Sequence, residues 1–553
     1  MRCIVDIETD GFIENLNTIH CIVAKDVDTN EVFSFVQDEC YTKFPEFSKK
    51  IDKFIMHNGI SFDARILNSF NITTITPTKV IDTLLLSQLL YPEIEGGHSL
   101  ASWGERFKSS KGDCEDFKYY TPEMLEYCKQ DVEITHKLYK YISSHLYGCP
   151  PQAIELEHKI RAIVDQQEIN GFSLDERKAS LLVAQFLDET IELETKLQEI
   201  FPPITHQRYS EKTGKKLQDK VEVFNVASRK QIAERLQTLG WIPKKVTPKG
   251  HVIVDEGVLK GIDLPEAQLI SRCLLLQKRM VQINSWRSLV DKNGRVHGKV
   301  MTLRAVTGRM AHHSPNMAQV PASYSIYGKE CRECWTVSDP DRYVLVGTDA
   351  SQLEIRCLAH YMNDEKFTKE ILEGDIHTYN QHKAGLKNRD EAKTFIYAMM
   401  FGAGAEKIGL IAGTSKQKGK LLIDSFLRNL PAFKNLKSNL EHTARGGRIK
   451  GLDGRPLVIR SSHKALNTLI QGAGAIICKT WLVCITKRIS SYNIDARLVA
   501  SIHDEYQFEV RKDHVEVFCT ITKDAMKEAE KILKLKCPMD NDYKIGKTWA
   551  ETH

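Results

Sequence analysis

Short apolar runs alternate with amphipathic stretches over the first part of the chain. The runs at residues 3–7 and 21–24 are rich in β-branched side chains and predict strands, whereas the stretches that follow have helical periodicity. This alternation breaks at Tyr147-Gly-Cys-Pro-Pro, where Gly and Pro end a helix and indicate a linker. Residues 1–147 are therefore predicted to form an α/β domain.

The rest of the chain changes pattern twice. From about residue 153 to 287, long amphipathic segments predominate and predict a mostly helical arm. Beyond it, strand-like stretches at residues 343–348 and 498–502 enclose a helical block near residues 362–480. A chain of 553 residues has room for about two to four domains, so the sequence predicts a multi-domain protein of the α/β and α+β classes.

Composition narrows the cellular setting. The hydrophobic residues are dispersed, and we expect no membrane partner because no apolar run is long enough to cross a bilayer. Asp6 and Glu8 interrupt the stretch where a signal peptide needs an unbroken apolar run, which favours an intracellular protein.

The 14 cysteines are scattered, as in a protein with reduced thiols. Cys331-Arg-Glu-Cys334 lacks the second pair that a zinc site needs, which favours a structural role.

The net charge of +5 is too small to indicate a nucleic-acid partner by itself. Two local stretches, residues 206–216 and 243–250, are nevertheless strongly basic. They fit either solvated loops or surfaces that contact phosphates.

Carboxylates are grouped in the amino-terminal part of the chain. Asp6 and Glu8 lie two residues apart in a predicted strand, so both side chains point to one face. An isolated acidic strand end is usually only solvated. Here His57-Asn-Gly-Ile-Ser-Phe-Asp63 follows, and then Tyr127-Cys-Lys-Gln-Asp131, whose ends share one helix face. This order of residues resembles the three motifs of the DEDD-type 3′–5′ exonucleases, tyrosine subclass.

The resemblance implies an RNase H-like exonuclease domain over residues 1–147. Such a domain uses two Mg²⁺ ions, which require hard oxygen ligands. The four carboxylates that would hold them are Asp6, Glu8, Asp63 and Asp131. Tyr127 would orient the attacking water. Asp82 is either a neighbour of this site or a helix cap.

A second group of carboxylates lies in the carboxy-terminal half. Asp349 ends a strand-like run and precedes a predicted helix that carries Glu354. Much later, His503-Asp504-Glu505 stands at a tight turn between two strand-like runs. Acids at the junctions of buried strands are typical of a catalytic site, although a surface hairpin with acidic turn residues has the same pattern.

Between these two groups, one predicted helix carries an unusual face. Arg389, Lys393, Tyr397 and Phe401 recur every four residues, so two cations and two aromatic rings share this face. An aromatic stripe is usually part of a core, but cations on the same line are unexpected there. The face suits a nucleoside triphosphate, with the cations at the phosphates and the rings toward sugar and base.

These segments resemble motifs A, C and B of the family A DNA polymerases, the family of bacterial DNA polymerase I. The further matching segments are Thr307-Gly-Arg309 with Pro315-Asn-Met-Ala-Gln319, Gly374-Asp-Ile-His377 and Asn467-Thr-Leu-Ile-Gln471. The resemblance covers nearly the whole chain. Residues 224–231, 240–250 and 549–553 look most like the replicative polymerases of short-tailed lytic bacteriophages.

The resemblance implies a right-hand polymerase domain beside the exonuclease domain. Its parts would be the thumb and connecting elements (148–300), the palm (301–361 and 472–553) and the fingers (362–471). The implied function is DNA-dependent DNA synthesis with proofreading, in phage genome replication.

The resemblance also implies roles for individual residues. Two Mg²⁺ ions, for which Mn²⁺ would substitute, would be held by Asp349, Ala350 and Asp504 and would support in-line displacement. The dNTP contacts would come from His377, Arg389, Lys393, Tyr397 and Glu354, of which Glu354 would disfavour ribonucleotides. Glu505 would support catalysis at the primer end. The DNA contacts would come from Arg309, Asn467, Gln471, His503 and Phe401, largely in the minor groove and at the template base.

Three features refine this expectation. Tyr397 stands where the family has Tyr or Phe, and the Tyr form implies acceptance of dideoxynucleotides. Phe401 stands where the family usually has Tyr, which leaves stacking but removes a hydroxyl. The interval from Asp131 to Thr307 is too short for the thumb insertion by which some phage relatives recruit thioredoxin, so we expect no thioredoxin dependence.

The expected partners are primer–template DNA, dNTPs, a phage helicase-primase and a single-strand-binding protein, in the cytoplasm of an infected bacterium. The chain starts directly at the exonuclease strand, so we expect no 5′ nuclease domain before it.

Two other functions remain open on the sequence. A single-subunit RNA polymerase shares motifs A, B and C, but Glu354 and the exonuclease segments argue against it. A catalytically silent DNA-binding protein would need the loss of Asp349 or Asp504, and both are present.

Overall fold

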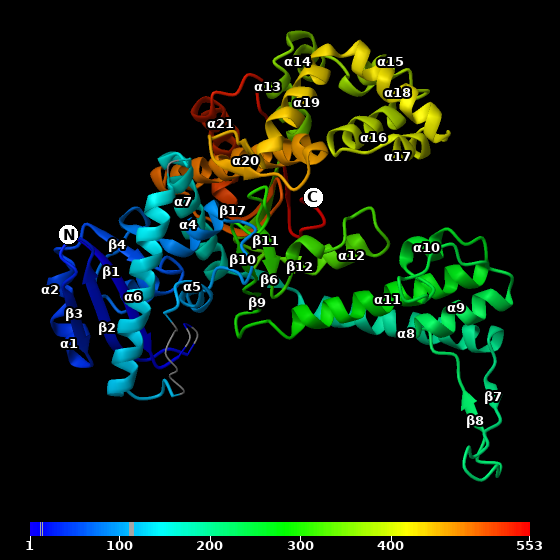
Figure 1. Ribbon diagram of the computed structural model, residues 1–553, viewed down its shortest axis with the longest axis horizontal. Helices are drawn as coiled ribbons and strands as arrows, with labels where there is room; N and C mark the ends of the chain where they lie inside the picture. Colours follow the sequence, from blue (N-terminus) through cyan, green and yellow to red (C-terminus); the bar gives the residue numbers. More distant parts are fainter. Residues whose placement is uncertain (12, 14, 110–115, 147) are drawn as a thin grey trace.

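The computed structural model describes residues 1–553 except residues 12, 14, 110–115 and 147. Figure 1 shows an amino-terminal α/β domain joined to a central region, from which a helical lobe and a long helical arm extend. The arm and the lobe extend to the same side of the central region.

The amino-terminal domain is built on a five-stranded sheet in the order β3-β2-β1-β4-β5. Its strands are β1 (Arg2–Thr9), β2 (Ile19–Asp26), β3 (Val32–Val36), β4 (Lys53–Met56) and β5 (Val80–Asp82). Its helices are α1 (Asp38–Thr42), α2 (Phe44–Ser48), α3 (Asp63–Ser69), α4 (Thr83–Leu90), α5 (Leu100–Arg106) and α6 (Pro122–His145). β1 pairs antiparallel with β2 and parallel with β4. The long α6 packs across β1 and β2 (Figure 1).

The predicted thumb is a pair of long helices, α8 and α11, that pack along each other. The elements of this part are α7 (Pro151–Asn170), β6 (Phe172–Leu174), α8 (Glu176–Ile200), β7 (Ile204–His206), β8 (Lys220–Glu222), α9 (Arg229–Thr238), α10 (Glu256–Lys260) and α11 (Pro265–Arg287). Asp175 caps α8 by accepting from the Lys178 amide at 2.9 Å. Leu182, Phe186 and Leu193 form a buried stripe at helical spacing, which explains the packing on α11.

The predicted palm contains a four-stranded antiparallel sheet in the order β16-β17-β13-β18. Its main elements are β13 (Tyr343–Ala350), α13 (Leu353–Met362), α20 (Ala465–Ser491), β16 (Ala496–Ile502), β17 (Glu505–Arg511), α21 (Val515–Leu533) and β18 (Asn541–Gly546). Shorter elements before the sheet are β9 (Arg295–Val296), β10 (Lys299–Met301), β11 (Ala311–His313), α12 (Gly328–Glu333) and β12 (Trp335–Thr336). Helices α20 and α21 pack on each other and share the core with Val346 and Phe508 of the sheet.

The helical lobe corresponds to the predicted fingers. Its elements are α14 (Glu365–Leu372), α15 (Ile376–Ala384), α16 (Arg389–Met400), α17 (Ala405–Ile411), α18 (Lys416–Asn429), α19 (Pro431–Thr443), β14 (Arg448–Lys450) and β15 (Pro456–Val458). Phe395 of α16, Phe426 of α18 and Phe433 of α19 are buried and pack edge to face, which holds the lobe together.

The predicted α/β and α+β multi-domain class is confirmed. The predicted linker falls between α6 and α7, although Tyr147 itself lies outside the described residues. The expectation that no apolar run is long enough to cross a bilayer was wrong. By length and composition alone, the helix Ser462–Ser491 is long and apolar enough to do so. In the structure 89% of its most apolar window is buried, because α20 is a core helix that packs on α21 and α7.

Candidate active sites

Asp349 and Asp504 lie close together at one end of the four-stranded sheet, where β13 ends and β16 turns into β17. Asp349 lies opposite Glu505 in the register between β13 and β17. The next residue, Ala350, donates its amide to the carbonyl of Asp504 at 3.1 Å. His503, in the turn between β16 and β17, has a positive φ of 57°, which allows the tight reversal. The predicted metal set of Asp349, Ala350 and Asp504 is therefore brought together.

Burial and the repulsion between neighbouring carboxylates make ionisation of Asp349 and Asp504 less favourable. Burial raises the pKa of Asp349 to about 8, and the carboxylate of Asp504 adds to the effect. Burial and the charge of Glu354 likewise raise the pKa of Asp504. Closely spaced carboxylates that resist ionisation are a suitable donor set for a hard divalent cation such as Mg²⁺, which would offset their repulsion.

Glu505 is fixed by residues near the end of the chain. Its Oε1 accepts from Trp549 Nε1 at 2.7 Å and from Gln507 Nε2 at 2.6 Å. Its Oε2 lies 2.6 Å from His553 Nδ1. Burial raises the pKa of Glu505, but the hydrogen bonds of His553, Gln507 and Trp549 outweigh it and lower the pKa. Trp549 and His553 had no predicted role here, because only the fold brings them to the site.

Arg309 and Glu354 form an ion pair beside these carboxylates. Arg309 Nη2 donates to Glu354 Oε1 at 3.1 Å, and both side chains are partly exposed. Glu354 lies in the first turn of α13. Arg309, His503 and Asp504 also line one small cavity, together with Cys478 and other residues of α20. A predicted DNA contact is thus adjacent to a predicted catalytic carboxylate.

Helix α16 has the predicted mixed face. Arg389, Lys393 and Phe401 are exposed and Tyr397 is half-buried, whereas Phe395 on the opposite face is in the core. The ring centroids of Tyr397 and Phe401 are 6.2 Å apart. Burial raises the pKa of the Tyr397 hydroxyl to about 12, with contributions from the charges of Glu354 and Asp504. Tyr397, at the aromatic end of α16, therefore lies within electrostatic reach of Glu354 and Asp504.

His377 joins the cationic end of this face. It is buried at the start of α15, and its Nδ1 has no hydrogen-bond partner within the described part of the chain. Burial lowers the pKa of His377, and the charges of Arg389 and Lys393 lower it further. The three predicted phosphate ligands therefore lie near one another.

The other predicted DNA contacts lie on α20. Asn467 and Gln471 occupy its first turns and are partly exposed. Asn467 Oδ1 is a buried atom that accepts no hydrogen bond from any described residue. An unmet acceptor of this kind is suited to a polar ligand.

The predicted exonuclease residues gather in the amino-terminal domain. Asp6 and Glu8 of β1 lie with Cys128 of α6 such that their ligand atoms are all within 4.8 Å. Asp63, at the start of α3, is buried; burial raises its pKa to about 7, and the charges of Asp82 and Asp131 contribute. The four predicted carboxylates thus come from one strand and two helices.

Tyr127 and Asp131 share α6, as the spacing predicted, and the Tyr127 ring lies 5.9 Å from that of Phe117. Cys128 was missed. Its Sγ lies 3.4 Å from Asp6 Oδ2 and 3.6 Å from the Asp6 carbonyl. Its position beside Tyr127 was visible in the sequence, but its orientation toward β1 was not.

Comparison with known proteins decides the family. Residues 203–551 match the family model described as DNA polymerase family A. The chain belongs to this family.

The relatives of this family A polymerase include phage enzymes that match it over nearly the whole length of both chains. The DNA-directed DNA polymerases of Escherichia phage T7 and Enterobacteria phage T3 are each 31% identical over 700 residues, which cover 99% of this chain and 99% of the relative. The POL domain of Pol1 from M. smegmatis, solved with DNA primer-template and dNTP, has a TM-score of 0.82 at 16% identity. That match covers 100% of this chain and 96% of the other, and it shows the fold.

The structure bears on two open alternatives for this polymerase, and for Asp82 it supports both. Asp82 is a helix cap: its side chain accepts from the amides of Leu84 and Leu85 at the start of α4. It also accepts from Asn58 and Ile60, so it orders the loop before Asp63. Cys331 and Cys334 are both buried, and neither forms a disulfide.

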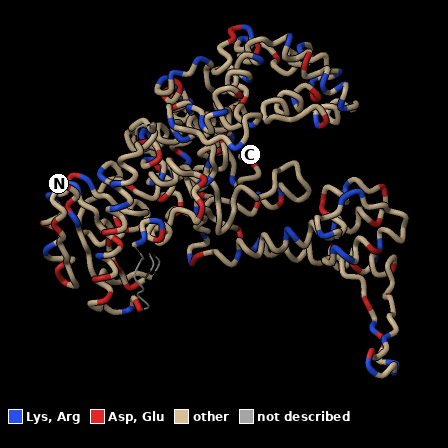
Figure 2. Tube along the Cα trace, in the orientation of Figure 1, with Lys and Arg blue, Asp and Glu red and all other residues tan. Residues whose placement is uncertain are grey.

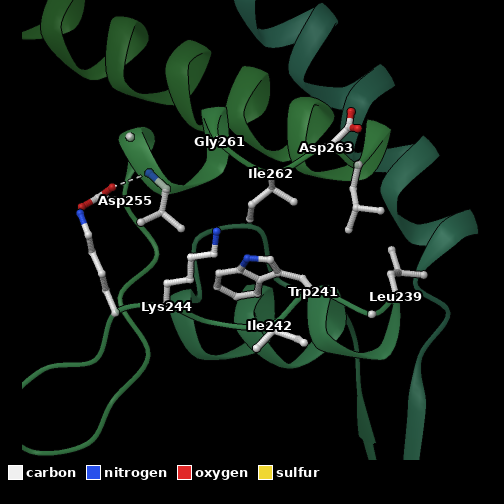
Figure 3. A pocket seen from close by; sticks show the side chains of 13 residues that line it. Leu239, Trp241, Ile242, Lys244, Asp255, Gly261, Ile262 and Asp263 are labelled. Carbon is white, nitrogen blue, oxygen red and sulfur yellow. Dashed lines mark hydrogen bonds between the residues drawn. The ribbon is translucent and has the colours of Figure 1, made fainter. Parts of the chain in front are cut away.

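The two basic stretches lie at the far end of the predicted thumb. One forms the β7–β8 hairpin, which projects beyond the helices in Figure 1, and Figure 2 shows Lys and Arg along it. The other borders a cavity of about 750 Å³ that lies between α9, α10 and α11. Figure 3 shows Trp241 in this cavity below Ile262, with Lys244 beside it. This cavity is separate from both carboxylate clusters.

Proposed function

We propose that this chain extends a DNA primer along a template with dNTPs by two-metal phosphoryl transfer, and removes 3′-terminal nucleotides at a second site. The observation that carries the first activity is the junction of Asp349 and Asp504. The Ala350 amide ties the two acids together at 3.1 Å from the Asp504 carbonyl, and burial with mutual repulsion raises the pKa of Asp349 to about 8. Family membership supports the same activity.

In the palm, Asp349, Ala350 and Asp504 would hold two Mg²⁺ ions. When bound, these ions would activate the primer 3′ hydroxyl and offset the charge of the triphosphate. Glu505, held by Trp549 and His553, would keep the primer end against this centre. A fixed carboxylate loses no side-chain freedom when the primer arrives, which favours correct alignment.

The incoming dNTP would lie along α16. Arg389, Lys393 and His377 would bind the phosphates with charge-assisted hydrogen bonds. Tyr397 would face the sugar, and Glu354 would occupy the space of a 2′ hydroxyl, which disfavours ribonucleotides. Phe401, exposed at the end of α16, would stack on the template base.

The primer–template would lie between fingers and thumb. Four side chains would contact the end of the duplex: those of Arg309, Asn467, Gln471 and His503. Polar groups of the protein placed in the minor groove would sense the shape of the duplex there. Residues 204–250 at the thumb end carry eleven Lys and Arg against four Asp and Glu, a net charge of +7 that exceeds the +5 of the whole chain. This concentration of charge suits contacts with duplex phosphates.

Proofreading would take place in the amino-terminal domain. Asp6, Glu8, Asp63 and Asp131 would hold the metal ions there, and Tyr127 would orient the attacking water. The proximity of these acids supports this role. Mg²⁺ or Mn²⁺ would supply charge neutralisation at both sites.

The biological setting is phage replication in the cytoplasm of an infected bacterium, with a helicase-primase and a single-strand-binding protein as partners. Likeness to the phage T7 and T3 enzymes supports it. The alignment spans 700 residues although this chain has 553, so those relatives contain segments without a counterpart here. This difference favours synthesis that does not depend on thioredoxin.

Extension of a labelled primer–template with dNTPs or NTPs tests the proposal. We expect Mg²⁺-dependent, template-directed extension with dNTPs and little extension with NTPs. Preferential use of NTPs would favour the single-subunit RNA polymerase alternative, and binding of DNA without any extension would favour a catalytically silent protein.

A further inference from the structure

One carboxylate in the fingers contacts two helices that carry predicted phosphate ligands. Asp375 caps α15: its Oδ1 accepts from the amide of His377 at 3.0 Å and from that of Thr378 at 3.4 Å. Its Oδ2 accepts from Thr378 Oγ1 at 2.9 Å and from Arg389 Nε at 2.6 Å. Arg389 is the first residue of α16, so Asp375 connects the beginnings of α15 and α16.

The bond to Arg389 leaves the phosphate-binding side of the guanidinium available. Arginine has five N–H donors, and Asp375 uses only Nε–H. Nη1 and Nη2 form no hydrogen bond within the described part of the chain, and 51% of the Arg389 side chain is exposed. An arginine that is already oriented loses less conformational freedom when it binds a ligand.

Asp375 also balances the charges around His377. The positive charges of Arg389 and Lys393 lower the pKa of His377, and the charge of Asp375 acts in the opposite direction. The hydrogen bond of Arg389 in turn holds the pKa of Asp375 well below its usual range, so the carboxylate is ionised at neutral pH. Asp375 therefore offsets part of the positive charge that Arg389 and Lys393 place near His377.

We propose that Asp375 is a positioning residue for the triphosphate: through Arg389 and the start of α15 it sets the phosphate ligands in place before the nucleotide binds. This inference rests on the proposed function of the fingers. Asp375 would act on nucleotide affinity and not on the chemical step, because it reaches the phosphates only through its neighbours.

The same lobe provides a matched control. Asp364 caps the neighbouring helix α14 by accepting from the Phe367 amide at 2.9 Å, and it forms no ion pair with any described residue. Asn and Ser are good helix caps, so Asp375→Asn and Asp375→Ser remove the charge while retaining a cap. Asp364→Asn makes the same change where no arginine is present.

Single-nucleotide incorporation at saturating primer–template measures the effect. We expect Asp375→Asn to raise the KM for dNTP by about threefold to tenfold, as loss of a partly exposed charged hydrogen bond implies, while kcat stays within about twofold. Asp375→Ser should give the same result, and Asp364→Asn should behave as the wild type. An unchanged KM in a folded Asp375→Asn protein, or an equal rise in Asp364→Asn, would overturn the proposal.

A second pair of variants separates this inference from the function on which it rests. Arg389→Lys should raise the KM for dNTP, and combining it with Asp375→Asn should raise it little further, since both changes act through one interaction. If Arg389→Lys leaves the KM unchanged, the phosphate role of α16 is wrong. If Arg389→Lys raises the KM but the second substitution multiplies it independently, only the positioning role of Asp375 is wrong.

Discussion

Arg309 donates to Glu354 at 3.1 Å, so a predicted DNA contact and the predicted sugar-selecting residue form one ion pair. Replacing Glu354 therefore changes two interactions together. We expect Glu354→Ala to raise NTP incorporation relative to dNTP incorporation by about tenfold to a hundredfold, because it opens the space for a 2′ hydroxyl. Competition between matched dNTP and NTP substrates measures this ratio.

Glu354→Gln separates volume from charge. It retains nearly the same bulk but weakens the pair with Arg309, so selectivity against NTPs should persist while primer–template affinity changes. Equal loss of selectivity in the Gln and Ala variants would contradict steric exclusion at this position.

Tyr397 should make dideoxynucleotides efficient chain terminators. Its half-buried ring lies near Glu354 and Asp504. In the proposed function, its hydroxyl would face the position of the sugar hydroxyl that a terminator lacks. Tyr397→Phe should reduce ddNTP incorporation relative to dNTP by about tenfold or more, since a polar group at the site is removed. Termination as frequent in the Phe variant as in the wild type, measured on a sequencing ladder, would refute this role.

A buried ion cluster connects α7 to α20 and to the turn that follows β14. Lys479 Nζ donates to both carboxylate oxygens of Glu157, at 2.9 and 2.7 Å, and Arg455 Nη1 donates to it at 2.5 Å. Glu157→Gln leaves two buried cations with one partner fewer and should lower the free energy of unfolding by about 3–5 kcal/mol. Glu155→Gln, which breaks the exposed pair with Lys159 on the same helix, should change it by less than about 1 kcal/mol.

The cluster also predicts a pH dependence. Burial raises the pKa of Glu157, but Lys479 and Arg455 outweigh it, and the pKa in the folded protein is lowered. Its contribution is therefore present above the unfolded-state pKa of about 4.3 and is lost as the pH falls through the folded-state value. Urea denaturation should show the wild type and Glu157→Gln converging in acid; a constant difference at all pH values would contradict this account.

The thumb end should contribute electrostatically to DNA binding. Replacing Lys212, Lys215 and Lys220 of the hairpin by Gln should make the dependence of log Kd on log salt shallower, by about 0.9 for each DNA phosphate that is no longer neutralised. Gln at Lys43, Lys49 and Lys50, in the amino-terminal domain, should leave the slope unchanged. An unchanged slope in the hairpin variant would mean that these lysines are only solvated.

Local pattern predicted the elements that carry both carboxylate clusters. The two-residue period of the strand around Asp6 determines which way its side chains point, and so does the four-residue spacing from Arg389 to Tyr397. In the structure these side chains lie on β1 and α16, on the faces that the spacing predicts. These features depend only on residues that are close in the sequence, and they could therefore be predicted from the sequence alone.

Contacts between distant segments were not predictable. Glu505 depends on Trp549 and His553, and nothing local to β17 indicates that the end of the chain returns to it. Lys479 lies in the apolar run of α20, where its partner Glu157 is known only from the fold. The apolar run itself resembles a membrane span in composition. A core helix that is surrounded by protein and a helix that spans a membrane both need apolar side chains on every face.

The central claim is that two separate carboxylate clusters perform synthesis and degradation. Primer extension and single-strand degradation should be measured on the folded Asp349→Ala and Asp6→Ala variants with Mg²⁺ present. We predict that Asp349→Ala abolishes extension and retains degradation, and that Asp6→Ala does the reverse. Loss of both activities in either folded variant would contradict the assignment of two sites.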